Sequence, residues 1–158
     1  MTDPASTRAP LLERFATGFD AVEAALDGAT DADLDRHGPA GWSARMVVHH
    51  LADSEAMAYT RIRRLLADDA PVVIQGYDEP TWADRLHYDR PIEASLAVVQ
   101  AVRAASLSLL ATLTADEWTR TGTHSESGSY TVDGWLAIYA EHPHEHAEQI
   151  RRARRGED

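Results

Sequence analysis

The sequence predicts one all-α domain folded as a four-helix bundle. Apolar residues recur with a period of about 3.6 in four long segments, and no segment keeps the alternation of a β-strand. The chain has 158 residues and no internal repeat, a length at which a single domain buries its own core. We therefore treat residues 1–158 as one domain and expect each apolar segment to form one helix of the bundle.

The first two expected helices are separated by a polar link. The first helix is expected at about residues 8–27, followed by Gly28 as a helix stop, because one face carries Leu12, Phe15, Phe19, Val22 and Leu26. The link is rich in Asp and ends in Gly38-Pro39-Ala40-Gly41. Ser43 is the expected N-cap of the second helix, which should run to about Asp68.

The second half of the chain repeats this pattern with longer connections. The third helix should begin near Pro91 and pack through Leu96, Val99, Leu107 and Leu110. Residues 69–90 are too long and too apolar for a plain linker, so we expect them to pack over one end of the bundle. A turn-rich stretch follows Leu113, and the fourth helix is expected from about Thr131 to Arg155.

Composition excludes several classes of partner. The formal charge of −11 repels phosphate backbones and anionic lipids, so nucleic acid and membranes are not expected partners. The C-terminal arginines 151, 152, 154 and 155 lie where cations complement a helix dipole, which we favour over an anion-binding patch. With no signal-like segment and no apolar stretch of roughly 18 residues, a soluble cytoplasmic protein is expected.

Helical phase indicates which of the eight histidines face the core. His50 shares the apolar stripe of the second helix with Val47, Leu51 and Ser54, whereas His49 points to the opposite side and is expected at the surface. On the fourth helix, His142 and His146 share a face that also carries Trp135, Ile138, Tyr139, Gln149 and Ile150. His144 points away from that face.

His50, His142 and His146 are the candidate ligands of a divalent metal ion. Two histidines four residues apart on a helix can reach one ion, and His50 would supply a third nitrogen from a facing helix. Imidazole nitrogens suit zinc or nickel, and three ligands leave coordination positions open. The alternative is that these are separate core or surface histidines. Pro143 should free the carbonyl of Tyr139 and kink the helix locally.

Several motifs resemble the DinB/YfiT-like superfamily, in order along nearly the whole chain. They are the segment from Trp42 to Glu55, Glu117-Trp118, Tyr130-Thr131-Val132, and the segment from His142 to Ile150. The resemblance implies an up-down-down-up four-helix bundle, often dimeric, with a zinc or nickel ion on His50, His142 and His146. Relatives with known activity include transferases that use bacillithiol, mycothiol or glutathione, and a thiol-dependent maleylpyruvate isomerase. The family name carries no evidence for DNA binding.

Three functions stay open at this point. In the leading hypothesis, the metal activates a low-molecular-weight thiol, which must be external because the chain has no cysteine, toward a small electrophile. Arg61 and Arg103 face inward and could hold a carboxylate of a cosubstrate, although arginine heads more often reach out to solvent.

The second hypothesis is a metal-dependent hydrolase, in which Glu145 of the H-x-x-E-H pattern is the base for a metal-bound water. Proteases with this pattern take a further ligand from well downstream, whereas twelve residues follow His146 here. The third hypothesis is a metal-bound sensor or interaction module without catalysis. Whether the chain is an enzyme, and which residues would be catalytic, stays open in the sequence; a small molecule and a second copy of the chain are the expected partners.

Overall fold

The computed structural model describes residues 4–38 and 41–157, so Pro39 and Ala40 of the expected first link lie outside the described residues. Its long helices are α1 (Pro4–Ala16) with α2 (Gly18–Leu26), α4 (Ala44–Ala67), α6 (Glu93–Leu110) and α8 (Val132–Arg155). Short helices are α3 (Asp31–Asp35), α5 (Glu79–Arg85) and α7 (Ala115–Trp118), and the strands are β1 (Val73–Ile74), β2 (Thr121–His124) and β3 (Gly128–Thr131).

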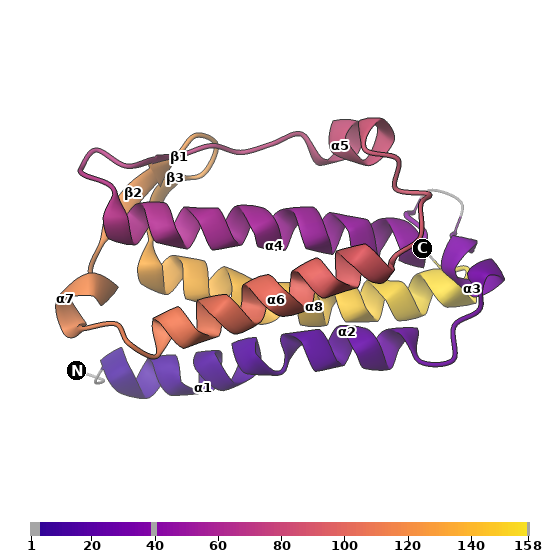
Figure 1. Cartoon of the computed structure of the whole chain (residues 1–158), viewed down its shortest axis with the longest axis horizontal. Coiled ribbons are helices and arrows are strands. Elements are labelled where there is room, and N and C mark those ends of the chain that lie inside the picture. The colour runs from indigo at the N-terminus through magenta and orange to yellow at the C-terminus, as the bar shows by residue number, and fades with distance from the viewer. Residues whose placement is uncertain (1–3, 39–40, 158) are drawn as a thin grey trace.

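The long helices lie side by side as a four-helix bundle (Figure 1). The column formed by α1 and α2 runs in one direction, α4 and α6 both run in the opposite direction, and α8 returns in the first. The predicted up-down-down-up bundle is therefore confirmed. This order places α4 and α8, which carry the candidate metal ligands, in contact along the core.

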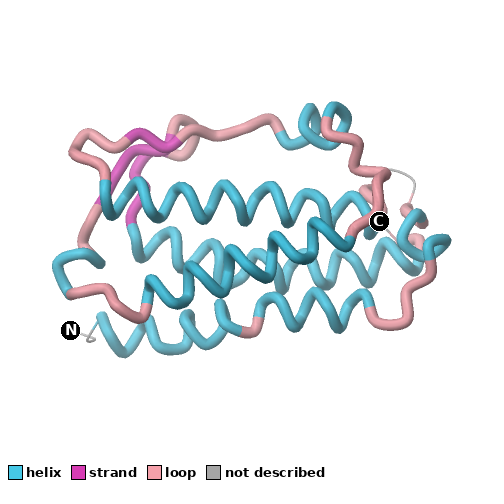
Figure 2. The backbone as a smooth tube through the Cα atoms, viewed as in Figure 1, coloured by secondary structure: helices cyan, strands magenta, loops and turns pink. Residues whose placement is uncertain are grey.

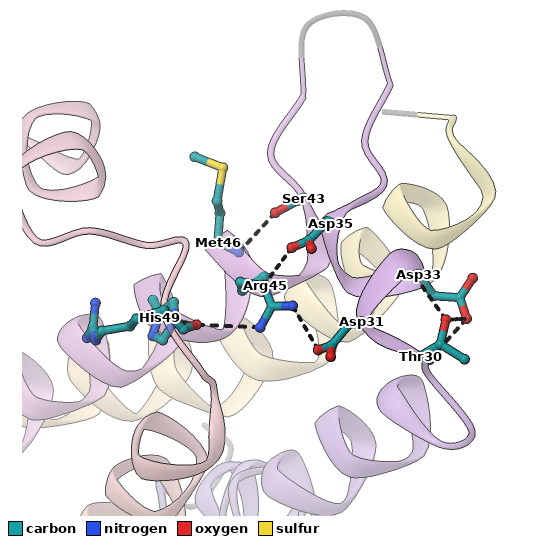
Figure 3. Close-up of polar contacts among 9 residues, drawn as sticks. Thr30, Asp31, Asp33, Asp35, Ser43, Arg45, Met46 and His49 are labelled. Carbon is teal, nitrogen blue, oxygen red and sulfur yellow. Dashed lines mark hydrogen bonds and ion pairs between the residues drawn. The ribbon is translucent and has the colours of Figure 1, made fainter.

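The first turn of α4 is fixed by polar contacts at one end of the bundle (Figure 3). Ser43 Oγ accepts a hydrogen bond from the Met46 backbone N–H at 3.2 Å, which is the predicted N-cap. The Arg45 guanidinium donates to Asp35 at 2.6 Å and to Asp31 at 3.0 Å. Because Asp31 and Asp35 lie at the two ends of α3, these ion pairs hold the short helix against the start of α4.

The expected first helix is instead two helices, interrupted at Thr17. The interruption accompanies a close approach between helices at Gly18. A Cβ at this position would lie 2.5 Å from Pro143 Cγ and 2.7 Å from Arg103 Nη2, so a larger residue would not fit without a shift. Apolar periodicity continues through the interruption, which is why the sequence predicted one helix.

The segment 69–90 does not pack over one end of the bundle as expected. It runs back alongside α4 for most of its length, because consecutive helices α4 and α6 point the same way (Figures 1 and 2). It also carries β1, which pairs in parallel with β2, while β2 pairs antiparallel with β3. These strands are two to four residues long, too short to give a recognisable alternation.

Two of the C-terminal arginines, Arg154 and Arg155, make contacts near the ends of helices. The Arg154 guanidinium donates to the backbone carbonyls of Ala25 and Asp27, at the end of α2. Arg155 pairs with Glu157 and Glu148. Gly156 ends α8 in the left-handed conformation, at a φ of 73°. Both arginines thus have partners within the chain.

One described helix, α6, is long and apolar enough to cross a membrane by length and composition. A core helix of a soluble protein passes the same test, so a single helix of this kind is weak evidence for a span. In this fold α6 packs against α4 and buries the charged side chain of Arg103.

A polar layer divides the core into two apolar clusters. One cluster is centred on Ile62 and Trp135, and the other on Leu51 and Ile150. Between them lie a charged pair, Glu55 of α4 and Arg103 of α6, and a close approach between Gly18 of α2 and Pro143 of α8.

Arg103 is the centre of this layer. Its Nη1 donates to Glu55 Oε1 at 2.6 Å, and the two side chains are only 4% and 2% exposed. Nη1 also reaches the Tyr139 carbonyl at 3.2 Å, and Nη2 reaches the Phe15 carbonyl at 2.6 Å. The expectation that its head reaches solvent is wrong for Arg103. The carbonyl that Pro143 frees in α8 and a carbonyl at the end of α1 both find their donor here.

We predict that Arg103→Met lowers the free energy of unfolding by about 3–5 kcal/mol, because Glu55 is left buried and unpaired. In a Glu55→Met background the same change should cost clearly less. Urea unfolding of the four proteins measures this cycle. Arg64→Met is the control, since its pair with Asp68 is exposed and should be worth less than about 1 kcal/mol. Equal costs for Arg103→Met in both backgrounds would contradict the assigned pairing.

Candidate metal centre

His50 of α4 converges with His142 and His146 of α8. The ring centroids are 4.4 Å apart for His142 and His146, 4.8 Å for His50 and His146, and 5.6 Å for His50 and His142. One nitrogen of each ring lies within 4.8 Å of the other two. The structure thus brings together the three histidines that helical phase selected from eight.

A hydrogen bond turns one nitrogen of His146 toward the centre of this group. His146 Nδ1 lies 2.7 Å from the Gln149 side-chain oxygen and donates to it, which leaves the Nε2 lone pair free. His142 Nε2 faces this atom at 3.1 Å, and His142 Nδ1 lies 4.0 Å from Glu55 Oε1. An acceptor behind the ring and the other nitrogen directed at the group, as in His146, is the arrangement of metal-binding histidines.

The donor set fits a divalent ion. His50 Nδ1 and His142 Nδ1 are buried and make no hydrogen bond to any described residue. Burial lowers the pKa of His50 to about 4, helped by the neighbouring His146, and it also lowers the pKa of His142 and His146. The three imidazoles are therefore neutral at pH 7, which is the form that binds a metal.

The sequence did not single out Glu55 as part of the site. Its helical phase lies about 140° from that of His50, at the edge of the apolar stripe. Burial raises the pKa of Glu55, and the Arg103 guanidinium opposes that rise. The pair could not be predicted from either helix alone, because Glu55 lies on α4 and Arg103 on α6.

The expectation that His49 lies at the surface is wrong. It is fully buried, with Nδ1 2.7 Å from Ser95 Oγ and Nε2 2.9 Å from the Arg90 carbonyl. Nε2 must donate to the carbonyl, so Nδ1 accepts from the Ser95 hydroxyl. Burial lowers the pKa of this histidine as well. The side of α4 that carries His49 is covered by the turn into α6, which helical phase alone does not reveal.

The remaining candidates of the sequence take separate places. Arg61 donates to the Tyr139 hydroxyl and to the Gln75 carbonyl, each at 2.9 Å. His144 lies away from the three histidines, with Nε2 2.9 Å from the Arg14 carbonyl. Glu145 is exposed.

A small pocket reaches the site beside His142. It has a volume of about 230 Å³ and lies between α4, α8, the β2–β3 turn and the segment 69–90, which we call the crossover segment. Its lining comprises Ser54, Arg61, Gly76, Tyr77, Glu79, His124, Glu126, Ile138, Tyr139 and His142. Glu145 does not line it.

We predict that His50 makes the metal-free protein acid-sensitive. Its folded-state pKa of about 4 lies below the unfolded value of 6.5, so only the unfolded chain gains a proton as the pH falls between them. The stability that neutral His50 contributes is present above pH 6.5 and is lost on acidification. Urea unfolding with a chelator should show a loss between pH 7.5 and 4.5 that is smaller in His50→Gln by about 2 kcal/mol. Parallel pH curves for the two proteins would contradict this.

Comparison with known proteins assigns this chain to a family. The model of the DinB superfamily matches residues 14–150. A protein of Oceanobacillus iheyensis is 41% identical over 110 residues, which is 70% of this chain and 63% of that protein. YfiT of Bacillus subtilis is 33% identical over 133 residues, covering 82% of this chain and 74% of YfiT. Both carry the name "Putative metal-dependent hydrolase".

The solved structure of YfiT has the same fold. It superposes with a TM-score of 0.88 at 28% identity, covering 98% of this chain and 89% of that one. YfiT is described as having an unusual four-helix bundle topology. On the match across residues 14–150 and the shared bundle, the chain belongs to the DinB superfamily.

Proposed function

We propose that this protein is a metal-dependent enzyme that transfers a low-molecular-weight thiol to a small electrophile, with the ion held by His50, His142 and His146. The observation that carries the proposal is the convergence of three neutral imidazoles from two helices, that of His50 buried and those of His142 and His146 half-buried. The names of the relatives support a metal-dependent reaction. Zinc and nickel both suit three imidazole nitrogens.

A divalent ion with three protein ligands keeps positions for an outside ligand and lowers the pKa of a thiol or water bound there. The chain's own residues set the geometry. Gln149 orients the ring of His146 by a hydrogen bond, and Glu55 Oε1 lies 4.0 Å from His142 Nδ1, between the two apolar clusters. In the transfer, the thiol loses its proton to solvent, its sulfur forms a bond to the electrophilic carbon, and the leaving group departs with the bonding electrons.

The position of Glu145 favours a thiol over water as the nucleophile. In the hydrolase hypothesis this carboxylate takes a proton from water, but it is exposed and does not line the pocket beside His142. A thiol that coordinates the metal ion is deprotonated outright, whereas metal-bound water keeps a pKa of about 7, so the thiol depends less on a base of this kind. The hydrolase stays the second candidate, because the relatives are named as hydrolases.

We predict that protein purified without a histidine tag holds close to one equivalent of zinc or nickel. Metal content should be lost in His50→Ala and in His142→Ala/His146→Ala, because each change removes nitrogen ligands from the group. His144→Ala is the matched control on the same helix, since it contacts Arg14 instead of the group. Elemental analysis gives the stoichiometry, and a wild type that also fails to take up added zinc, nickel or manganese would refute the site.

Turnover separates the three functions. The loaded protein should conjugate a fluorogenic electrophile such as monochlorobimane with an added thiol, and Glu145→Gln should keep the rate. Hydrolysis of an activated ester without thiol, abolished by Glu145→Gln, would favour the hydrolase. Stoichiometric metal with neither activity would favour the non-enzymatic sensor or interaction module. The small-molecule substrate, the homodimer and the cytoplasmic location all stay proposals.

A further inference from the structure

The pocket beside His142 contains ionic groups of both signs that have no ion-pair partner. Arg61 lies in its wall, and Glu79 and Glu126 also line it. Within 4.0 Å, the described part of the chain gives none of these three an oppositely charged group, although it carries many ion pairs elsewhere.

Arg61 is held in place by neutral groups. Its Nη1 donates to the Tyr139 hydroxyl and its Nη2 to the Gln75 carbonyl, each at 2.9 Å. Its Nε is buried and has no acceptor among the described residues. The Tyr139 ring in turn lies 5.8 Å from the ring of His142, measured between centroids. The guanidinium is thus a fixed positive charge one aromatic ring away from the proposed metal ligands, with donor capacity left over.

The carboxylates of Glu79 and Glu126 supply the negative charge in the pocket lining. Both are exposed, so they lie toward solvent relative to the half-buried Arg61. Partial burial and the nearby Glu126 raise the pKa of Glu79, and the Arg61 guanidinium opposes this rise, so Glu79 is repelled by Glu126 and attracted by Arg61. The Glu126 carboxylate lies over the bare backbone of Gly76, where any Cβ would collide with it. A bound ammonium group would relieve this repulsion.

The size of the pocket limits the ligand. Its volume of about 230 Å³ is below the roughly 300–1,000 Å³ of pockets for drug-sized ligands. The wall also offers the hydroxyls of Ser54 and Tyr77. A small polar molecule fits this lining better than an apolar one.

We propose that this pocket binds a small amino-carboxylate molecule, with its carboxylate on Arg61, its ammonium group at Glu79 and Glu126, and a metal-binding atom directed to His142. This inference rests on the proposed function, because the third point of attachment is the metal. It names the class of cosubstrate as a zwitterion the size of an amino acid.

Four thiols with the same metal-binding atom test the proposal on cobalt-loaded protein under anaerobic conditions. They are 2-mercaptoethanol (neutral), 3-mercaptopropionate (anionic), cysteamine (cationic) and L-cysteine (both charges). Titration of the thiolate-to-cobalt absorption band gives a Kd for each. For each thiol, dividing the Kd of a variant by the Kd of the wild type removes the contribution of the thiol's own affinity for cobalt. A metal-sensitive dye in each titration detects any cobalt removed by chelation.

Arg61→Gln should weaken 3-mercaptopropionate and L-cysteine about tenfold, as for the loss of a charged hydrogen bond, and leave the other two thiols unchanged. Glu79→Gln/Glu126→Gln should weaken cysteamine and L-cysteine about threefold, since these carboxylates are exposed. Arg64→Gln is the matched control. It removes the same charge from α4 but at a residue paired with Asp68 outside the pocket.

Two results overturn this inference while leaving the proposed function intact. One is that Arg61→Gln changes all four Kd values alike, which would give Arg61 a structural role only. The other is that the Kd ratios do not depend on the charges of the thiol. Failure of the wild type to take up cobalt, or to give a thiolate band with any thiol, would overturn the proposed function and this inference with it.

Discussion

The buried ion pair of Glu55 and Arg103 is the interaction on which the centre of this bundle depends. A buried pair gains little over well-packed apolar residues, so stability alone does not explain it. Its use lies in what else it satisfies. The Arg103 guanidinium also binds one carbonyl at the end of α1 and another that Pro143 leaves free in α8. One side chain therefore holds three helix columns at the same level.

That level is also where the candidate metal centre lies. The apolar clusters around Trp135 and Leu51 fill the bundle on either side of this layer. Desolvation there keeps the histidines neutral, and Gln149 orients the ring of His146 on α8. The polar layer between the apolar clusters thus contains both the Glu55–Arg103 pair and the three histidines of the candidate metal centre.

The pocket beside His142 depends on the topology of the bundle. Because α4 and α6 run in the same direction, the chain must return along the bundle between them, and this crossover segment lies beside α4 (Figure 1). The segment contributes Gly76, Tyr77 and Glu79 to the pocket wall, and the β2–β3 turn contributes Glu126. A bundle in which consecutive helices alternate in direction could connect them by short loops and would leave this face of α4 uncovered. The connection that the unusual topology requires therefore builds the entrance to the site.

The sequence by itself determined the four-helix bundle, the N-cap at Ser43 and the three histidines that converge, because helical periodicity records which residues share a face. Tertiary structure decided the rest. His49 was assigned to solvent because phase cannot show that the start of α6 covers the second side of α4. The Glu55–Arg103 pair joins two helices far apart in the chain. The interruption at Thr17 lies next to Gly18, which closely approaches Pro143 on another helix. Periodicity is a property of one segment, whereas partners and close approaches are properties of two.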